Sequence, residues 1–525
     1  MSLIVKENLI DKAIAYFSPE KAKKRLMART QLALAGGYTG GKVDRTALAR
    51  YLPHAGSATT DIIPDLQNLR SRSRDQTRNA PVATGALNTT VSHVIGTGLS
   101  YTPNINAKRL GLSDSQRDEW HNDTKERFNL WASSSDCDLA RKLNFYEQQD
   151  LILRNMLDSG DIAIITPLVS RNGERQLALQ AVEADRICNP DRKPNSDDLI
   201  EGVRIDPSTG EIKSLYIAKK HPADAKGNNE WQEISLRGGA TGRRNVLFLF
   251  ESLRPGQARG VPFIAPIIEP LKQLQRYTDA ELNAAVISGM FSVFIKMDPE
   301  AFDTLFDDEA KGALIDNASQ WTGELQAGNQ AVNLLPGESV ESPNPGRPNA
   351  QFDPFWQAIV RQIGMSLGMP FEVLTMHFQS SYSAARAALL MAWKMYRKRR
   401  EFMASNFCQP IFELWLANEV ASGRINAPGF FSSAIVRSAW CGAVWTGDGP
   451  GSIDPEKEVD AATKRVNLGI STLEAESIAH DGIGFEEKHA QRAKEISLQK
   501  RDGTYVPPNA YAAIQTQSKE NPTKK

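Results

Sequence analysis

The stretch FDPFWQAIVRQIGMSLGMP, residues 352–370, sets the architecture that the sequence predicts for the rest of the chain. Its apolar residues recur three and four positions apart, as on one face of an α-helix: Phe352, Phe355, Trp356, Ile359, Val360, Ile363 and Leu367. Asp353 as N-cap with Pro354 behind it predicts the start of this helix, and Gly368 followed by Pro370 predicts its end. At ~1.5 Å per residue the helix is roughly 25 Å long.

Two further helices are predicted around this one. Downstream, the polar connector FEVLTMHFQSSYS, residues 371–383, precedes a helix at 384–403 whose first half is apolar and rich in alanine. Its second half carries five cations against the single acid Glu401: Lys394, Arg397, Lys398, Arg399 and Arg400. Upstream, residues 270–290 form another helical pattern, which places five residues on one face: Leu271, Leu274, Thr278, Leu282 and Ala285.

The composition is that of an ordinary globular protein, with 62 basic and 62 acidic residues among 525 and no net charge. A protein that grips nucleic acid over its whole surface needs a cationic excess, so the charge balance excludes that class but permits a channel through which DNA slides. The four separated cysteines predict reduced, buried thiols. No apolar run approaches the ~20 residues of a membrane span, and the N-terminal segment lacks a signal-peptide pattern. These features predict synthesis in a reducing cytoplasm.

From Asp161 the periodicity changes from helical to alternating. The segments DIAIITPLV and RQLALQAVE flank Asn172-Gly173, a dipeptide typical of β-hairpins, and further strand patterns follow at GVRID, KSLYIAK and VLFLFE. They predict an antiparallel sheet of about five strands over residues 161–251. Combined with the helices, this gives the α+β fold class.

Residues 65–79 form a helical pattern that carries four arginines: Arg70, Arg72, Arg74 and Arg78. A cationic helix face of this kind is most often solvated, so we expect it to face water. A contact with a neighbouring subunit or with DNA is the alternative.

The sequence lacks the motifs that would carry catalysis. Gly36, Gly41 and Lys42 fit the frame of a phosphate-binding loop, but Val43 stands where a magnesium-binding Ser or Thr is required. The seven histidines are scattered, and neither H-E-x-x-H nor G-x-S-x-G is present. We therefore expect no enzyme, no catalytic residue, no metal site and no cofactor. A nucleotide hydrolase that uses residues 36–42 is the lesser alternative.

Three segments carry a resemblance to a known family: GMPFEVLT (368–375), SSYSAARAALLMAWK (380–394) and LRPGQARGVPFIAPIIEPLK (253–272). They closely resemble the portal proteins of lambda-type tailed bacteriophages, and the resemblance runs from about residue 36 to about residue 499. It implies a mainly helical α+β subunit of a ring, usually of twelve copies. Wing, stem, clip and crown regions then surround an axial DNA channel.

The resemblance also implies how the chain is divided. In order, the regions are an N-terminal helical wing part (1–160), an antiparallel β wing (161–261), stem helix 1 (262–290), the clip (291–350), stem helix 2 (351–369), a tunnel loop (370–383), a spine helix with the wing/crown base (384–450), crown helices (451–502) and a disordered tail (503–525).

Site residues follow from the same resemblance. The tunnel loop would touch the phosphate backbone of DNA without reading bases, through Thr375, His377, Gln379, Ser380 and Ser381. Glu281 is a candidate channel-lining acid, and Arg386 is expected to hold the base of the loop through a buried ion pair. In the clip, Glu338 and Glu341 are candidate contacts for docking proteins.

The implied function is a channel at one capsid vertex through which double-stranded DNA is packaged and ejected. The implied partners are further copies of the chain, DNA bound without sequence specificity, the terminase large subunit, major capsid or scaffold proteins, and head-completion proteins, with no membrane. The subunit would be made in the cytoplasm of a bacterial host and end in the virion. A connector ring without a packaging role is the alternative.

Overall fold

The computed structural model describes residues 9–34, 46–48, 50–171, 173–224, 229–289, 294–297, 338–341, 349–378, 381–449, 455–505 and 507. The chain forms two compact units, Met1–Ser57 and Ala58–Lys525. In the first unit, α1 (Leu9–Phe17) packs against α2 (Pro19–Leu34). The glycine loop at 36–42 lies outside the described residues.

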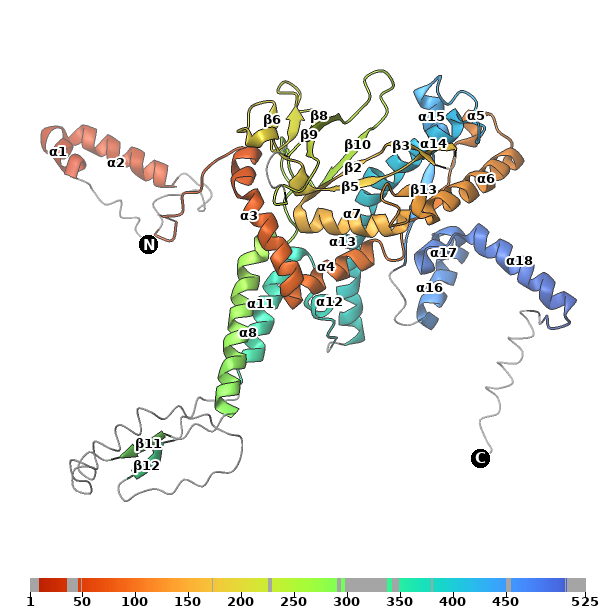
Figure 1. The fold of residues 1–525 in the computed structure, drawn as a ribbon. Helices are drawn as coiled ribbons and strands as arrows, with labels where there is room; N and C mark the ends of the chain where they lie inside the picture. Colours follow the sequence, from red (N-terminus) through yellow and green to blue (C-terminus); the bar gives the residue numbers. More distant parts are fainter. Residues whose placement is uncertain are drawn as a thin grey trace, which may run out of the picture. The chain divides into compact units, whose positions relative to one another are not determined.

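Local capping signals define the helices that open the second unit (Figure 1). Pro81 occupies the first turn of α4, and reciprocal capping boxes start α6 (Ser113 with Gln116) and α7 (Asn144 with Glu147). The elements of this part are α3 (Ala58–Asn79), α4 (Pro81–Val94), β1 (Ser100–Pro103), α5 (Ala107–Leu110), α6 (Asp114–Ser133) and α7 (Phe145–Ser159).

The strands that follow are antiparallel, as predicted, but they do not form one sheet. They are β2 (Asp161–Ile165), β3 (Leu168–Arg171), β4 (Glu174–Leu177), β5 (Gln180–Glu183), β6 (Leu199–Ile200), β7 (Val203–Ile205), β8 (Ile212–Ala218), β9 (Trp231–Ser235) and β10 (Val246–Phe250). A three-stranded sheet has the order β10-β2-β5, a four-stranded sheet the order β6-β7-β8-β9, and β3-β4 is the expected hairpin at Gly173. The single-sheet prediction is wrong, since the strands divide into two sheets and a hairpin. Pro167, which has no N–H for a ladder, separates β2 from the hairpin β3-β4.

Helices dominate the remainder of the second unit. Its elements are α8 (Ile268–Gly289), β11 (Phe294–Met297), β12 (Glu338–Glu341), α11 (Phe352–Leu367), α12 (Phe371–Thr375), α13 (Tyr382–Met403), a π-helical turn (Ala404–Cys408), α14 (Gln409–Ala421), α15 (Ala434–Trp440), β13 (Ala443–Thr446), α16 (Pro455–Asn467), α17 (Leu473–Asp481) and α18 (Phe485–Arg501).

The three predicted helices are present, but their termini differ: α8 spans Ile268–Gly289 where 270–290 was predicted, and α13 begins at Tyr382 where 384 was predicted. α11 starts at Phe352 after Gln351, so Asp353 lies inside the first turn, where its carboxylate accepts a hydrogen bond from Gln357. Its assignment as N-cap was therefore wrong. Gly368 ends the helix with a left-handed φ of 68°, as predicted.

An aromatic cluster joins the N-terminal helices to those near the C-terminus. Phe128 of α6 is fully buried, and its ring centroid lies 5.0 Å from that of Tyr101, 5.1 Å from Trp415 and 5.5 Å from Phe412. Aromatic pairs at these separations add to the free energy of area burial. β1 and β13 pair beside this cluster, so segments far apart in the second unit, from α4 to α14, share one core.

A buried carboxylate at the start of β2 joins three further segments. Asp161 accepts hydrogen bonds from Arg259 Nε at 2.8 Å, Arg259 Nη2 at 2.9 Å, Arg70 Nη2 at 2.9 Å and the Gly260 backbone N–H at 2.9 Å. Burial alone would raise the pKa of Asp161, but the two guanidinium groups hold it below its ordinary value. The carboxylate is therefore ionised at neutral pH.

Arg259 is as deeply buried as its partner. Its remaining N–H groups donate to the carbonyl oxygens of Ile187 at 2.8 Å, Ala184 at 2.8 Å and Glu201 at 2.5 Å. Gly260 makes room for this arrangement, since a Cβ there would meet the carbonyl oxygen of Gly160 at 1.9 Å. The segment 253–263 thus holds the β2 sheet, the turn at 184–187 and α3 together.

This arrangement overturns part of the prediction for residues 65–79. Arg70 is buried, and it also donates to the Ser159 carbonyl at 2.9 Å, while Arg74 is paired with Asp185. Burial lowers the pKa of Arg70 to about 10, which leaves it charged at neutral pH. Arg72 and Arg78 are exposed, as expected.

We expect Arg259→Met to lower the free energy of unfolding by about 3–5 kcal/mol, because the substitution leaves Asp161 buried without its main partner. Asp161→Asn should also destabilise the protein. Arg117→Met, which removes surface ion pairs with Asp114 and Asp118, is the control and should leave the urea midpoint almost unchanged. Equal midpoints for the Arg259 and Arg117 variants would contradict this account.

Candidate functional site

α8 and α11 lie side by side and form a helix pair (Figure 1). Its inner face buries Leu271 and Leu274 of α8 against the core that contains Val360 and Ile363 of α11. Farther along, the ring of Tyr277 lies 5.4 Å from that of Phe352 and 5.1 Å from that of Phe355. The pair is therefore held by apolar and aromatic contacts along one side of each helix.

The outer surface of this pair leaves large apolar side chains in water. Leu282 is 63% exposed, Phe355 52% and Met365 77%, and Val286 is exposed as well. Single exposed apolar residues are common, but several on one two-helix element indicate a surface that another protein covers.

A tight turn connects the pair to the segment that follows. The Met369 N–H donates to the Gly364 carbonyl at 2.8 Å, which brings residue 369 against α11. A Cβ at Gly364 would lie 2.5 Å from the Met369 carbonyl oxygen, so a larger residue at 364 cannot fit unless this turn moves. The two glycines of GMSLG thus fix the direction in which the chain leaves α11.

The first part of the predicted tunnel loop is helical. In α12, Val373 and Leu374 are buried, and this short helix packs against α4. The guanidinium of Arg361 lies 4.9 Å from the ring centroid of Phe371, and the Thr375 hydroxyl donates to the Phe371 carbonyl at 2.8 Å. The Thr375 side chain is therefore partly buried and bonded within α12, unlike the free loop residue that was expected.

The exposed part of the connection begins after α12. Met376 has a left-handed φ of 54°, and His377 and Phe378 are exposed. The His377 N–H donates to the Glu372 carbonyl at 3.1 Å, which caps α12. Ser381 is exposed directly before α13, whereas the predicted residues Gln379 and Ser380 lie outside the described part of the chain.

Two arginines that the sequence did not single out hold α13 in place. Arg400 donates to the carbonyl oxygens of Val94 at 3.0 Å, His93 at 2.9 Å and Asp448 at 2.8 Å, so its charge lies at the C-terminus of α4. Arg399 lies over the ring of Phe263 at 4.1 Å. In the sequence both belong to a basic run that is typical of a solvated face, so no local signal separated them from their neighbours.

His93 has a packing role. Its ring stacks on that of Tyr396 with centroids 4.9 Å apart. Burial and the nearby charge of Arg400 lower the pKa of His93, which favours the neutral ring.

The structure changes the interpretation of two predicted charged residues. Arg386 lies 3.7 Å from Glu458 of α16, and its side chain is 42% exposed. The predicted buried ion pair is wrong, because Arg386 occupies the first turns of α13, which water reaches. Glu281 accepts a hydrogen bond from Asn349 Nδ2 at 2.9 Å and is only partly exposed.

Glu338 and Glu341 are the terminal residues of β12, which pairs with β11 in antiparallel register. Glu341 lies opposite Phe294 and Glu338 opposite Met297. Their places at the two ends of one strand put both acids on the same short ribbon.

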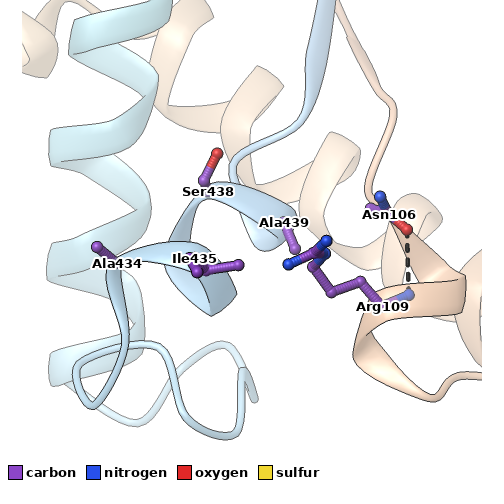
Figure 2. Close-up of a pocket in the computed structure, with 6 residues that line it drawn as sticks. All are labelled: Asn106, Arg109, Ala434, Ile435, Ser438 and Ala439. Carbon is purple, nitrogen blue, oxygen red and sulfur yellow. Dashed lines mark hydrogen bonds between the residues drawn. The ribbon is translucent and has the colours of Figure 1, made fainter.

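No group of three His, Cys, Asp or Glu side chains among the described residues is placed to hold a metal ion. Among the helices in the described part of the chain, none is long and apolar enough to cross a membrane. A cavity of about 380 Å³ lies between α5 and α15. Figure 2 shows its lining residues, with Arg109 extending toward Ala439. The Ser438 hydroxyl in its lining has no His or acidic neighbour among the lining residues to act as a base.

Comparison with known proteins gives a consistent result. Residues 44–400 match the family described as phage portal protein, lambda family. The portal protein of Escherichia phage N15 is 27% identical over 504 residues, covering 91% of this chain and 93% of that protein. Portal protein B of Escherichia phage lambda is 25% identical over 502 residues, covering 92% and 93%.

A solved chain from the neck of a native gene transfer agent particle aligns with 79% of this chain and 92% of its own length. The TM-score of that alignment is 0.42 and the sequence identity is 11%.

Gly364→Ala should lower the free energy of unfolding by about 1–3 kcal/mol, because the new methyl group must displace the Met369 carbonyl and the turn into α12. Gly239→Ala is the matched control, since a Cβ at 239 meets no atom within 4 Å. Urea unfolding measures both variants. If Gly364→Ala unfolds at the same urea concentration as Gly239→Ala, the tight turn does not constrain the chain.

Proposed function

Since this chain belongs to the lambda family of phage portal proteins, we propose that its copies close into a ring at one capsid vertex, through which double-stranded DNA is packaged and later ejected. The role is structural, and the energy for packaging would come from a separate motor. We infer that this motor is the terminase large subunit. After packaging, head-completion proteins would bind the end of the ring at which the motor had docked.

The observation that carries this proposal is the surface of the α8/α11 pair. The inner side of the pair is packed, while Leu282, Phe355 and Met365 remain exposed in the isolated subunit. A heterologous contact, in which one side of a subunit meets the other side of its neighbour, covers such residues in every copy once the ring closes. The pair would then be the stem that walls the channel.

We assign the other regions around this stem. The ribbon β11-β12 belongs to the clip, where Glu338 and Glu341 would contact docking proteins. α13 and the π-helical turn form the spine, α16 to α18 the crown, and the sheets with α3 to α7 the wing. Major capsid or scaffold proteins would surround the wing.

We propose that the tunnel loop comprises residues 376–381, which follow α12. Thr375 is left out of the proposed DNA-facing set because its hydroxyl donates to the Phe371 carbonyl within α12. His377, Ser381 and the neighbouring Gln379 and Ser380 would make transient contacts with phosphates. Neutral side chains suit this role, since strong phosphate binding would oppose the sliding of DNA.

Rings of several hundred kilodaltons are expected from purified protein, whose subunit mass is 57.9 kDa. Leu282→Glu combined with Met365→Glu should shift the mass toward monomer, because charges replace the apolar groups that a neighbour covers. Leu130→Glu, an equally exposed apolar site on α6, is the control. Mass photometry measures assembly and circular dichroism checks the fold. A wild-type protein that stays monomeric at high concentration would refute the ring.

Replacing residues 376–381 by a Gly-Ser linker of equal length should leave the ring mass unchanged but impair DNA packaging or retention. The same replacement of the exposed turn 207–210 is the control. Packaged DNA is measured in particles assembled with each variant. Unchanged packaging and retention would show that the loop assignment is wrong.

Intact wild-type rings that never engage a terminase would favour a connector without a packaging role.

A further inference from the structure

A cleft of about 540 Å³ lies between α13 and the C-terminal helices α16 and α17. Leu389, Leu390 and Trp393 of α13 form one wall. Apolar residues of α16 and α17 form the other, among them Val459, Ala462, Val466 and Leu473. Arg386 and Glu458, whose charged groups lie 3.7 Å apart, also line it. An apolar cleft with a polar edge fits an apolar group of another protein.

The same helices also present an exposed apolar projection. Leu468 is 74% exposed and Ile470 is 72% exposed in the turn between α16 and α17. None of the described residues of α16, α17 and α18 is buried. Helices without a buried face gain little from packing within the subunit, so an additional contact would stabilise them.

Charge is distributed unevenly along α16. Its first half contains three acids, Glu456, Glu458 and Asp460, against the one cation Lys457, and its last turn contains Lys464 and Arg465. Glu458 is paired with Arg386 and Arg465 with Glu476. Within the described residues, Glu456, Asp460 and Lys464 make no ion pair. One end of the helix is thus acidic beside an apolar cleft, and the other is basic beside an apolar projection.

We propose that α16 docks head to tail on the next copy of this chain, with Leu468 and Ile470 of one subunit entering the cleft between α13 and α16 of its neighbour. Lys464 then meets the acidic first half of the neighbouring α16. This inference rests on the proposed ring, because only a heterologous arrangement brings the two unlike ends together in every copy.

A second copy fits this cleft because each chain carries both halves of the contact. The projection supplies two aliphatic side chains for the apolar walls, and the opposite charges of the α16 ends fix the direction of docking. The contact would buttress the crown independently of the α8/α11 pair.

Thiol cross-linking tests the contact with little background. Cys137, Cys408 and Cys441 are buried, and burial raises the pKa of Cys137 and of Cys441 to about 12. Cys188 is partly buried and accepts a hydrogen bond from Trp231 Nε1 at 3.3 Å, and burial raises its pKa as well. Such thiols react slowly at neutral pH. Ile470→Cys subunits and Val459→Cys subunits would be purified separately, mixed in equal amounts, assembled and treated with a short bismaleimide. Each subunit then carries one added exposed thiol, so a covalent dimer reports a contact between copies.

We expect a covalent dimer on a denaturing gel from this mixture. Each variant alone, and Ile470→Cys mixed with Leu130→Cys, should give none. Mass photometry of the same samples separates the two ways of failing. Rings of normal mass without the dimer would overturn the head-to-tail contact and leave the ring intact. If no ring forms from wild-type protein, the proposed function fails, and this contact fails with it.

Discussion

The ion pair between Asp161 and Arg259 is the constraint on which the arrangement of the second unit depends. Both groups are withdrawn from water, which is tolerable only because every donor of Arg259 that points inward meets an oxygen. The pair joins β2, the central strand of the β10-β2-β5 sheet, to the segment that leads into α8. The start of α8 is therefore fixed relative to the β10-β2-β5 sheet by this buried ion pair.

Two further arginines extend this logic from the sheet to α13. Arg70 reaches the same carboxylate from α3, and Arg400 joins α13 to the end of α4 and to Asp448. α3 and α4 are consecutive helices that pack against each other. Hydrogen-bonded guanidinium groups thus hold the β10-β2-β5 sheet, α3, α4 and α13 together where apolar packing alone would leave their directions open.

Local sequence signals predicted the positions of the helices better than the long-range contacts that their side chains make. Apolar spacing and Gly368 were enough to place α11, since both act within one helix. The same reasoning treated Arg70 and Arg74 as solvated, because their acids lie 91 and 111 positions away in the chain. α12 was missed since five residues are too few to show a helical period. Arg386 was assigned a buried partner, but its partner lies on α16 and remains in water.

The π-helical turn at 404–408 has a mechanical consequence. A π turn accommodates one extra residue per turn, so it rotates the following helix about its axis without interrupting the rod. α13 can therefore pack against α4 while its continuation, α14, packs against β4. No loop separates these two contacts. A torque applied at the N-terminal end of α13 would therefore pass through α14 to β4 as a rotation, and no hinge would absorb it.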